Sequence, residues 1–295
     1  MDSSELHPDK KPSWLKVKFP SHKNYFFVAG LLKEKGLHTI CQSAKCPNAA
    51  ECWTKKTATF LILGDTCTRS CAFCAVKKGM PDHPSEDEAR RVAEAASAMN
   101  LRYVVATSVT RDDLPDGGAS RFAETIKALK ENIPGVRVEV LIPDFNGNEK
   151  ALKTVVDARP DVLNHNLEVP KSLYASINRT KESYDRSLEV LEGASRKGAI
   201  TKSGLMIGLG ETDKDILQAF SDLRSVSCDL LTIGQYLRPG KENVSVKKYY
   251  SPLEFSQLKK IALDFGFEEV ESGPLVRSSY NAYNMYRSFM RKRAH

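Results

Sequence analysis

Short apolar segments alternate with helical patterns through most of the chain, and this alternation limits the fold more than any other feature. Between the short segments, apolar residues recur at helical spacing, as in Phe122, Ile126 and Leu129. Units of strand, helix and parallel strand connect by a right-handed crossover and build either a barrel or a doubly wound open sheet. The strand candidates are residues 57–63, 103–106, 136–142, 161–163, 204–207 and 230–233.

The number of these units predicts an α/β fold with an incomplete barrel. Six units fall short of the eight that close a TIM-type barrel, so we expect a partial (β/α)6 TIM-type barrel that is open at one side. The sequence on either side lacks the alternation and is expected to form an N-terminal and a C-terminal extension. The predicted division of the chain is residues 1–56, 57–270 and 271–295.

The composition is typical of a globular protein. Hydrophobic residues make up 41% and charged residues 27% of the chain, which excludes collagen-like and fully disordered classes. The net charge is +7, but the basic residues lack interleaved aromatic residues, so we expect no nucleic-acid partner. Apolar runs are too short to cross a membrane. The first residues do not form a secretory signal, so we expect a cytoplasmic protein, or an organellar one if a transit peptide has been removed.

Six of the seven cysteines lie between Cys41 and Cys74, which favours metal chemistry over a disulfide framework. Three of them, in the pattern Cys67-x3-Cys71-x2-Cys74, follow the first predicted strand. Three thiolates on one loop can bind three irons of a cubane cluster and leave the fourth iron open. Zinc is the alternative, although only Cys71 and Cys74 have the spacing that is common in zinc sites. Cys228 lies apart and is expected to be a buried small hydrophobe.

Polar residues follow most of the predicted strands directly. Barrel enzymes carry their sites on the loops at the carboxyl ends of the strands, so one mouth would collect all of these residues. The pattern therefore predicts an enzyme. The segments are 67–74, 116–118, 164–168, 208–211 and 235–238.

The three-cysteine loop resembles that of the radical S-adenosylmethionine (SAM) superfamily. The resemblance implies a [4Fe–4S] cluster whose open iron binds SAM, which is cleaved to methionine and a 5′-deoxyadenosyl radical. It also implies that Phe73 lies near the adenine and that Asn166 and Glu168 bind the ribose or the amino group. Gly117 and Gly118 match a loop that contacts the SAM amino group, with a plain turn as the alternative. His165 is assigned no catalytic role.

A second cysteine triplet, Cys41-x4-Cys46-x5-Cys52, combines with Arg277-Ser-Ser-Tyr280 near the C-terminus. Both motifs together are similar to those of the lipoyl synthase family. The resemblance implies insertion of two sulfur atoms, at C6 and C8, into an octanoyl chain that is attached to a carrier lysine. An auxiliary [4Fe–4S] cluster on this triplet would donate the sulfur, with Ser279 as the fourth ligand and Ser278 as the fallback. Arg277 would position a carbonyl or carboxylate beside that cluster.

The resemblance implies three kinds of partner. They are an octanoylated carrier, such as the glycine-cleavage H protein or the lipoyl domain of a 2-oxoacid dehydrogenase, an electron donor such as ferredoxin or flavodoxin, and an iron–sulfur carrier protein. Lys241, Lys247, Lys248 and the basic residues 291–293 could steer an acidic carrier, with a solvated tail as the preferred interpretation of the last three.

Two other function classes remain open at this point. One is a different radical SAM enzyme with an auxiliary cluster, such as a methylthiotransferase or a biotin synthase relative. The other is an electron carrier or a zinc-stabilised binding module that uses the same thiols. A count of iron and sulfide separates the second class from the first, since two cubanes hold about eight of each.

Overall fold

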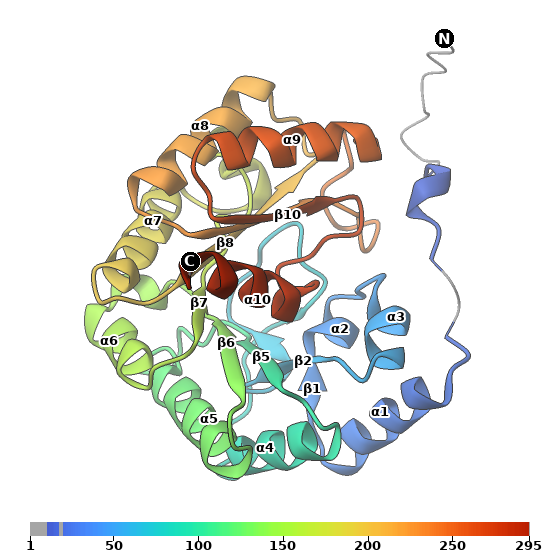
Figure 1. Cartoon of the computed structure of the whole chain (residues 1–295), viewed down its shortest axis with the longest axis vertical. Helices are drawn as coiled ribbons and strands as arrows, with labels where there is room; N and C mark the ends of the chain where they lie inside the picture. Colours follow the sequence, from blue (N-terminus) through green and yellow to red (C-terminus); the bar gives the residue numbers. More distant parts are fainter. Residues whose placement is uncertain (1–10, 18–19, 295) are drawn as a thin grey trace.

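The computed structural model describes residues 11–17 and 20–294, and its centre is an eight-stranded sheet (Figure 1). The strands from β2 to β10 run parallel to one another, and β1 pairs antiparallel with β2. All six predicted strands are present in this sheet. In spatial order the strands are β1 (His38–Thr39), β2 (Thr59–Ile62), β5 (Tyr103–Ser108), β6 (Arg137–Leu141), β7 (Val162–Asn164), β8 (Thr201–Ile207), β9 (Leu230–Gln235) and β10 (Glu269–Gly273).

Six helices follow strands β2 and β5 to β9 in turn and form the outer layer around the sheet (Figure 1). The predicted partial (β/α)6 barrel is therefore confirmed, with β10 as a further parallel strand. Among the described residues no ladder joins β1 to β10, so the barrel is open between these two edges. The outer helices are α4 (Glu88–Ala98), α5 (Ala119–Asn132), α6 (Glu149–Asp157), α7 (Lys181–Ser195), α8 (Asp213–Ser225) and α9 (Pro252–Asp264), and short 3-10 turns lie at Phe145–Gly147, Lys171–Leu173 and Ala175–Ile177.

The N-terminal extension packs on the first strands of the barrel. A helix of three turns forms in this extension between Pro20 and Pro47. Val28 and Leu32 on this helix are buried in the main core. The rings of Tyr25 and Trp53 lie 5.2 Å apart and join the first and third helices of the extension. These elements are a 3-10 turn (Ser13–Leu15), α1 (Lys23–Glu34), α2 (Ile40–Ser43) and α3 (Ala49–Thr54).

The C-terminal extension closes the end of the barrel at which the strands begin. Helix α10 (Ala282–Arg293) lies across the middle of the sheet in Figure 1. Its buried residues Met285, Tyr286 and Phe289 share a core with Tyr103 and Val162, the first residues of β5 and β7. Strand β10 crosses the predicted boundary at residue 270, so the extension continues directly from the sheet.

The basic C-terminal residues are exposed, as expected of a solvated segment, but they belong to this helix and do not form an irregular tail. They form the last turn of α10, where cations interact favourably with the helix dipole. Lys292 lies 2.9 Å from Glu269, and Arg293 lies 3.5 Å from Asp229. These ion pairs attach the helix to the start of β10 and to the loop before β9.

The sequence Ser85-Glu-Asp-Glu88 has the pattern of a capping box, which predicts a helix that starts after Ser85, but α4 starts differently. The helix begins at Glu88 after Asp87, so Ser85 lies outside it and donates a hydrogen bond to the Asp87 carboxylate. The buried Glu88 side chain instead accepts a hydrogen bond of 2.8 Å from the backbone amide of Leu63. A tertiary contact to the residue after β2 has replaced the local one, and it fixes the chain just before the first cysteine loop.

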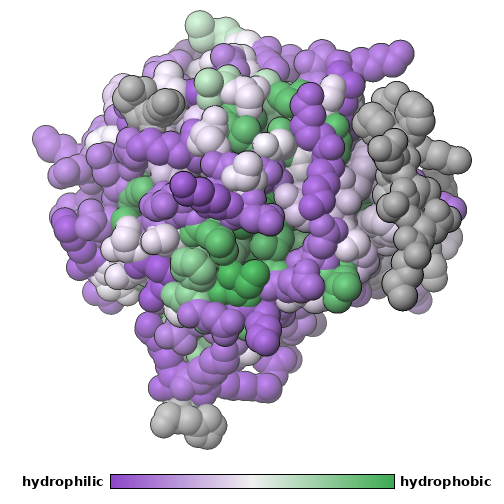
Figure 2. All heavy atoms as spheres, turned by 90° about the horizontal axis from the view of Figure 1, so that it is seen from above, coloured by the Kyte–Doolittle hydropathy of each residue, from purple (hydrophilic) through white to green (hydrophobic). Residues whose placement is uncertain are grey.

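The surface is largely hydrophilic, but Figure 2 shows a hydrophobic patch on the side formed by α8 and α9. Leu217 of α8, Leu263 of α9 and Phe265 at the end of α9 are exposed. The opposite faces of both helices are buried in the second core, through residues such as Phe220 and Phe255. In the part of the chain that the structure describes, no helix is both long and apolar enough to span a membrane.

A charged network crosses the interior of the barrel. The Lys202 amine lies 2.8 Å from the Glu139 carboxylate, and both side chains are 1% exposed. Glu139 also accepts hydrogen bonds from Tyr103 and Asn164. Burial and the neighbouring carboxylate raise the pKa of Tyr103 well above its usual value, so the phenol remains a donor. Each charge in this network depends on its partner, because water does not reach it.

We expect Lys202→Met to lower the free energy of unfolding by about 3–5 kcal/mol, since Glu139 would remain buried without its counter-charge. Chemical denaturation followed by circular dichroism measures this change. Lys153→Met is the matched control, because Lys153 is exposed on α6 and forms an exposed ion pair with Asp157. The control should change stability by no more than about 0.5 kcal/mol. Equal stability of the two variants would show that the buried pair is not needed.

Candidate active site

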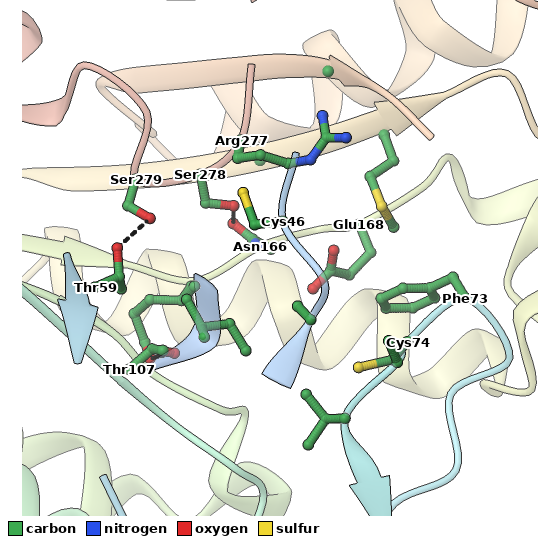
Figure 3. A pocket seen from close by; sticks show the side chains of 18 of the residues that line it. Cys46, Thr59, Phe73, Cys74, Thr107, Asn166, Glu168, Arg277, Ser278 and Ser279 are labelled. Carbon is green, nitrogen blue, oxygen red and sulfur yellow. Dashed lines mark hydrogen bonds between the residues drawn. The ribbon is translucent and has the colours of Figure 1, made fainter. Parts of the chain in front are cut away.

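A cavity of about 570 Å³ lies at the carboxyl ends of the parallel strands (Figure 3). In the view of Figure 3, Phe73 and Cys74 lie at one side, Thr59 and Ser279 at the other, and Asn166 between them. The structure thus brings together residues from all three predicted parts of the chain. The predicted site residues that line the cavity are Cys41, Cys46, Cys52, Cys67, Cys71, Phe73, Cys74, Asn166, Glu168, Arg277, Ser278 and Ser279.

The first cysteine triplet lies on a loop that begins in a small two-stranded sheet, β3 (Thr66–Cys67) with β4 (Lys77–Lys78). The Cys67 thiol accepts hydrogen bonds from the backbone amides of Arg69 and Thr110, at 3.4 and 3.3 Å. Burial, followed by the nearby Cys71 thiol among other groups, raises the pKa of Cys74 to about 11. Without a bound cation the Cys74 thiol therefore favours the protonated form.

Polar contacts on both sides hold this loop in place. The Arg69 guanidinium binds Asp112 at 2.8 and 2.9 Å and Asp144 at 2.6 Å. From the other direction, the buried Asn243 amide donates to the backbone carbonyls of Ala72 and Cys74, both at 3.1 Å. The loop is therefore fastened to the ends of β5, β6 and β9 before any ligand binds.

The second triplet lies on the N-terminal extension. Cys41 is on α2, Cys46 follows it on a tight turn, and Cys52 is on α3. The Cys46 amide donates to the Cys41 carbonyl at 2.9 Å, which folds this segment back on itself. Burial raises the pKa of Cys41, and burial with the charges of Cys41 and Cys46 raises the pKa of Cys52 to about 12. The three thiols are thus close enough to influence one another's charge.

The segment that follows β10 and contains Ser278 and Ser279, called the serine segment below, lies against this triplet. Asn48, between Cys46 and Cys52, donates a hydrogen bond of 2.6 Å to the carbonyl of Leu275. Ser279 accepts a hydrogen bond of 2.8 Å from the Thr59 hydroxyl, and Ser278 donates one of 3.0 Å to Asn166 (Figure 3). The two neighbouring serines therefore face different parts of the cavity.

Arg277 lies beside Cys46 and is partly buried. One guanidinium nitrogen donates a hydrogen bond of 2.6 Å to the carbonyl oxygen of Val276. Burial lowers the pKa of Arg277, while the Cys46 thiolate opposes this shift. The remaining guanidinium donors can serve a carbonyl or carboxylate in the cavity.

The thiols of each triplet are a donor set that suits an iron–sulfur cluster. Within residues 11–17 and 20–294, no three His, Cys, Asp or Glu side chains are grouped as ligands of a single metal ion. Three thiolates on one segment can each bind a different iron of a cubane and leave the fourth iron open. Both triplets line the same cavity and offer these donors there.

Glu168 and Arg179 occupy the part of the cavity near the first triplet. Burial raises the pKa of Glu168, with the Arg179 charge and a hydrogen bond from Asn166 acting in the opposite direction. Burial works to lower the pKa of Arg179, but Glu168 and Cys71 raise it above its usual value. Glu168 has a positive φ of 71°, which a non-glycine residue adopts only where its surroundings require it. The positive charge of Arg179 therefore acts on Cys71, and no sequence pattern indicated this role for Arg179.

His165 also lines the cavity. Burial lowers the pKa of His165 to about 4, so the ring is neutral at physiological pH. Its Nδ1 lies 2.8 Å from the Ile142 carbonyl and therefore carries the proton. Nε2 is then an acceptor that has no hydrogen-bond partner among the described residues.

Gly117 and Gly118, which were expected near the SAM amino group, are not among the residues that line this cavity. They lie at the start of α5 with φ values of 60° and 88°. A β-carbon on Gly118 would approach Leu63 to 2.3 Å, and one on Gly117 would approach Phe145 to 2.9 Å. Close packing and a left-handed turn explain these glycines, which favours the alternative of a plain turn.

The cavity and its cysteines agree with the comparisons to known proteins. The model of the Radical SAM superfamily matches residues 61–223. Lipoyl synthases from Caldanaerobacter subterraneus subsp. tengcongensis and Caldicellulosiruptor saccharolyticus are 53% and 54% identical, each over 92% of this chain and 96% of the relative. The chain belongs to the lipoyl synthase family. It is therefore an enzyme that uses SAM and a [4Fe–4S] cluster, which excludes the electron carrier and the zinc module.

Solved structures show the same fold at low sequence identity. Methylornithine synthase has a TM-score of 0.54 at 14% identity, over 85% of this chain and 82% of that chain. A maturase of the [FeFe]-hydrogenase has a TM-score of 0.57 at 12% identity, over 91% and 75%. These likenesses support the partial barrel in this lipoyl synthase family member.

Three residues of the site could not be found from the sequence. The sequence places Thr59 in a predicted strand and Asn48 in the N-terminal extension, and it indicates no role in the site for either residue. Arg179 stands 11 residues after Glu168 in the sequence, beyond two 3-10 turns. Each residue contacts a segment that is distant in the sequence, and no local sequence pattern predicts such a contact.

Gly234 in β9 tests how closely the serine segment packs. A β-carbon at this position would lie 2.2 Å from the Val276 carbonyl oxygen, so the backbone would have to move. We expect Gly234→Ala to destabilise the protein by about 1–3 kcal/mol in denaturation experiments. Gly30→Ala is the control, because nothing lies within 4 Å of that position on the exposed face of α1. It should be neutral or stabilising, and a similar loss in both variants would contradict the close packing.

Proposed function

We propose that this lipoyl synthase family member inserts two sulfur atoms, at C6 and C8, into the octanoyl chain of an N6-octanoyl-lysine on a carrier protein. The observation that carries the proposal is that both cysteine triplets and the serine segment line one cavity. The two C–H bonds lie on an alkyl chain that no protein base could deprotonate, so a radical is required. One cavity would then hold the radical source, the substrate and the sulfur.

In this proposal Cys67, Cys71 and Cys74 hold the cluster that binds SAM. When bound, the clusters and SAM supply an electron, a 5′-deoxyadenosyl radical and sulfide. Phe73 beside Cys74 offers its ring to the adenine, and Asn166 and Glu168 offer acceptors to the ribose or the amino group. These roles agree with the places that the side chains take in Figure 3.

Arg179 adds a positive charge to this subsite. It is partly buried, and the charges of the Glu168 carboxylate and the Cys71 thiol act on it. A buried cation needs anionic partners, and the SAM carboxylate would supply another one. We propose that Arg179 pairs with that carboxylate and so orients SAM against the Cys71 side of the site.

Cys41, Cys46, Cys52 and Ser279 would hold the auxiliary [4Fe–4S] cluster and so keep the sulfur beside the substrate. An alkoxide is a hard ligand for an otherwise thiolate-bound iron, which favours release of that iron. Arg277 lies next to Cys46 and would position a carbonyl or carboxylate there. Leu141, Ile142 and Met206 also line the cavity and provide apolar surface for an alkyl chain.

The partners in this proposal follow from the substrate and from the need for electrons. The carrier would be an octanoylated H protein or the lipoyl domain of a 2-oxoacid dehydrogenase, and ferredoxin or flavodoxin would supply electrons. An iron–sulfur carrier protein would rebuild the auxiliary cluster. The exposed Lys241 and Lys247 in the loop after β9 carry charges that suit an acidic carrier.

We expect Arg179→Met to weaken SAM binding by about 10- to 100-fold, since a hydrogen bond between charged groups contributes about 1.5–3 kcal/mol. Equilibrium binding of SAM to anaerobically reconstituted protein measures the loss. Arg196→Met is the control, because Arg196 is exposed at the end of α7. Wild-type affinity in Arg179→Met would remove Arg179 from the SAM subsite.

The two triplets predict different losses of function. Cys71→Ala should abolish SAM cleavage, whereas Cys46→Ala should still form 5′-deoxyadenosine but no thiolated product. The iron content of Cys46→Ala should fall from about eight to about four per chain, because only one cubane remains. Chromatography of 5′-deoxyadenosine and mass spectrometry of an octanoyl-lysine peptide, in search of the gain of two sulfurs, measure these outcomes.

Cys228→Ala is the control for this series. Cys228 is buried near the start of β9 and belongs to neither triplet. The iron content of Cys228→Ala and its yield of thiolated product should therefore equal those of the wild type. Normal formation of dihydrolipoyl product by Cys46→Ala would overturn the sulfur-donor assignment.

A further inference from the structure

Thr59 connects the two parts of the proposed auxiliary site. It is the first residue of β2, is 6% exposed, and pairs in register with Val105 of β5. Its hydroxyl donates a hydrogen bond of 2.8 Å to the Ser279 oxygen, across 220 positions of sequence (Figure 3). A rigid strand residue thus holds the side chain of a residue on an irregular loop.

The sheet places Thr59 beside the helix that carries a cysteine of the same site. The antiparallel register of β1 with β2, which pairs Thr39 with Phe60, brings the start of α2 next to Thr59. Thr59 therefore lies between Ser279, which accepts its hydrogen bond, and α2, which carries Cys41.

The neighbouring serine is held differently. The Ser278 hydroxyl donates to Asn166, and its oxygen lies 3.0 Å from where a β-carbon on Gly204 would be. Ser278 is therefore turned toward β8 and the loop after β7. The Ser279 oxygen instead lies against Thr59, next to the helix that carries Cys41.

We propose that Thr59 is a positioning residue that directs the Ser279 oxygen toward the iron held beside Cys41, Cys46 and Cys52 and sets the strength of that bond. The proposal rests on the function proposed above, because it requires Ser279 to be a ligand. Hydrogen bonds to metal ligands fix their orientation, and loss of such a partner typically weakens metal binding by about 10- to 100-fold.

The test measures release of iron from the reconstituted holoprotein, independently of catalysis. Protein loaded with 57Fe is exposed to a chelator, while Mössbauer spectra report the iron that has an oxygen ligand. We expect Thr59→Val to lose this one iron about 10- to 100-fold faster than the wild type. Thr59→Ser keeps the hydroxyl and should release iron at the wild-type rate.

Thr107→Val is a matched control on the next strand. Thr107 is also buried and lines the cavity, but its hydroxyl donates to the Leu141 carbonyl at 2.9 Å. It should leave the release of the oxygen-bound iron unchanged. If Thr59→Val does not fold, Thr59→Ala provides the same test, since it also lacks the hydroxyl.

Ser279→Ala separates failure of this inference from failure of the proposed function. Wild-type iron release and an unchanged Mössbauer spectrum in Ser279→Ala would show that Ser279 is not a ligand, and both proposals about it would fall. Fast release in Ser279→Ala with wild-type release in Thr59→Val would overturn the role of Thr59 alone. Equally fast release in Thr59→Ser and Thr59→Val would also overturn it, because the hydroxyl would not be responsible.

Discussion

The common direction of the strands from β2 to β10 is the constraint on which the candidate site depends. Backbone hydrogen bonds hold these strands parallel, so their carboxyl ends form one edge and their loops share one mouth. Strand β10 extends this edge beyond the six repeated units and delivers the serine segment to it. Helix α10 then closes the opposite end of the barrel. The cavity at the mouth is therefore lined by segments from the beginning, middle and end of the chain.

Buried polar contacts turn this arrangement into a defined geometry. Arg69 and Asn243 fasten the first cysteine loop from two sides, and Asn48 fastens the second triplet to the segment after β10. Such contacts are strong and directional in a buried environment, and an unpaired member would be costly. The protein can thus hold six thiols in place before clusters bind, although burial raises the pKa of several of them.

Local patterns predicted much of the fold. The six strands and the helices between them were found from short apolar runs and helical spacing, because each element has one face in the core. Other elements were not predicted, because contacts between segments that are distant in the sequence stabilise them. Helix α1 is held by Trp53 and the core, and α10 by the first residues of β5 and β7. At Glu88, a contact with Leu63 replaced the predicted cap.

The sequence by itself determined the chemistry of this protein. Cysteine spacing and the Arg277 to Tyr280 motif are the basis of the proposed iron ligands, because these are properties of residue type and local order. Only the tertiary structure decided how those atoms meet. Thr59 and Ser279 are 220 positions apart and touch because the sheet places β2 near the segment after β10. Gly117 and Gly118 match a motif by order, yet packing against Phe145 and Leu63 holds them outside the cavity lining. Contacts of this kind are set by the path of the whole chain, and no local pattern encodes them.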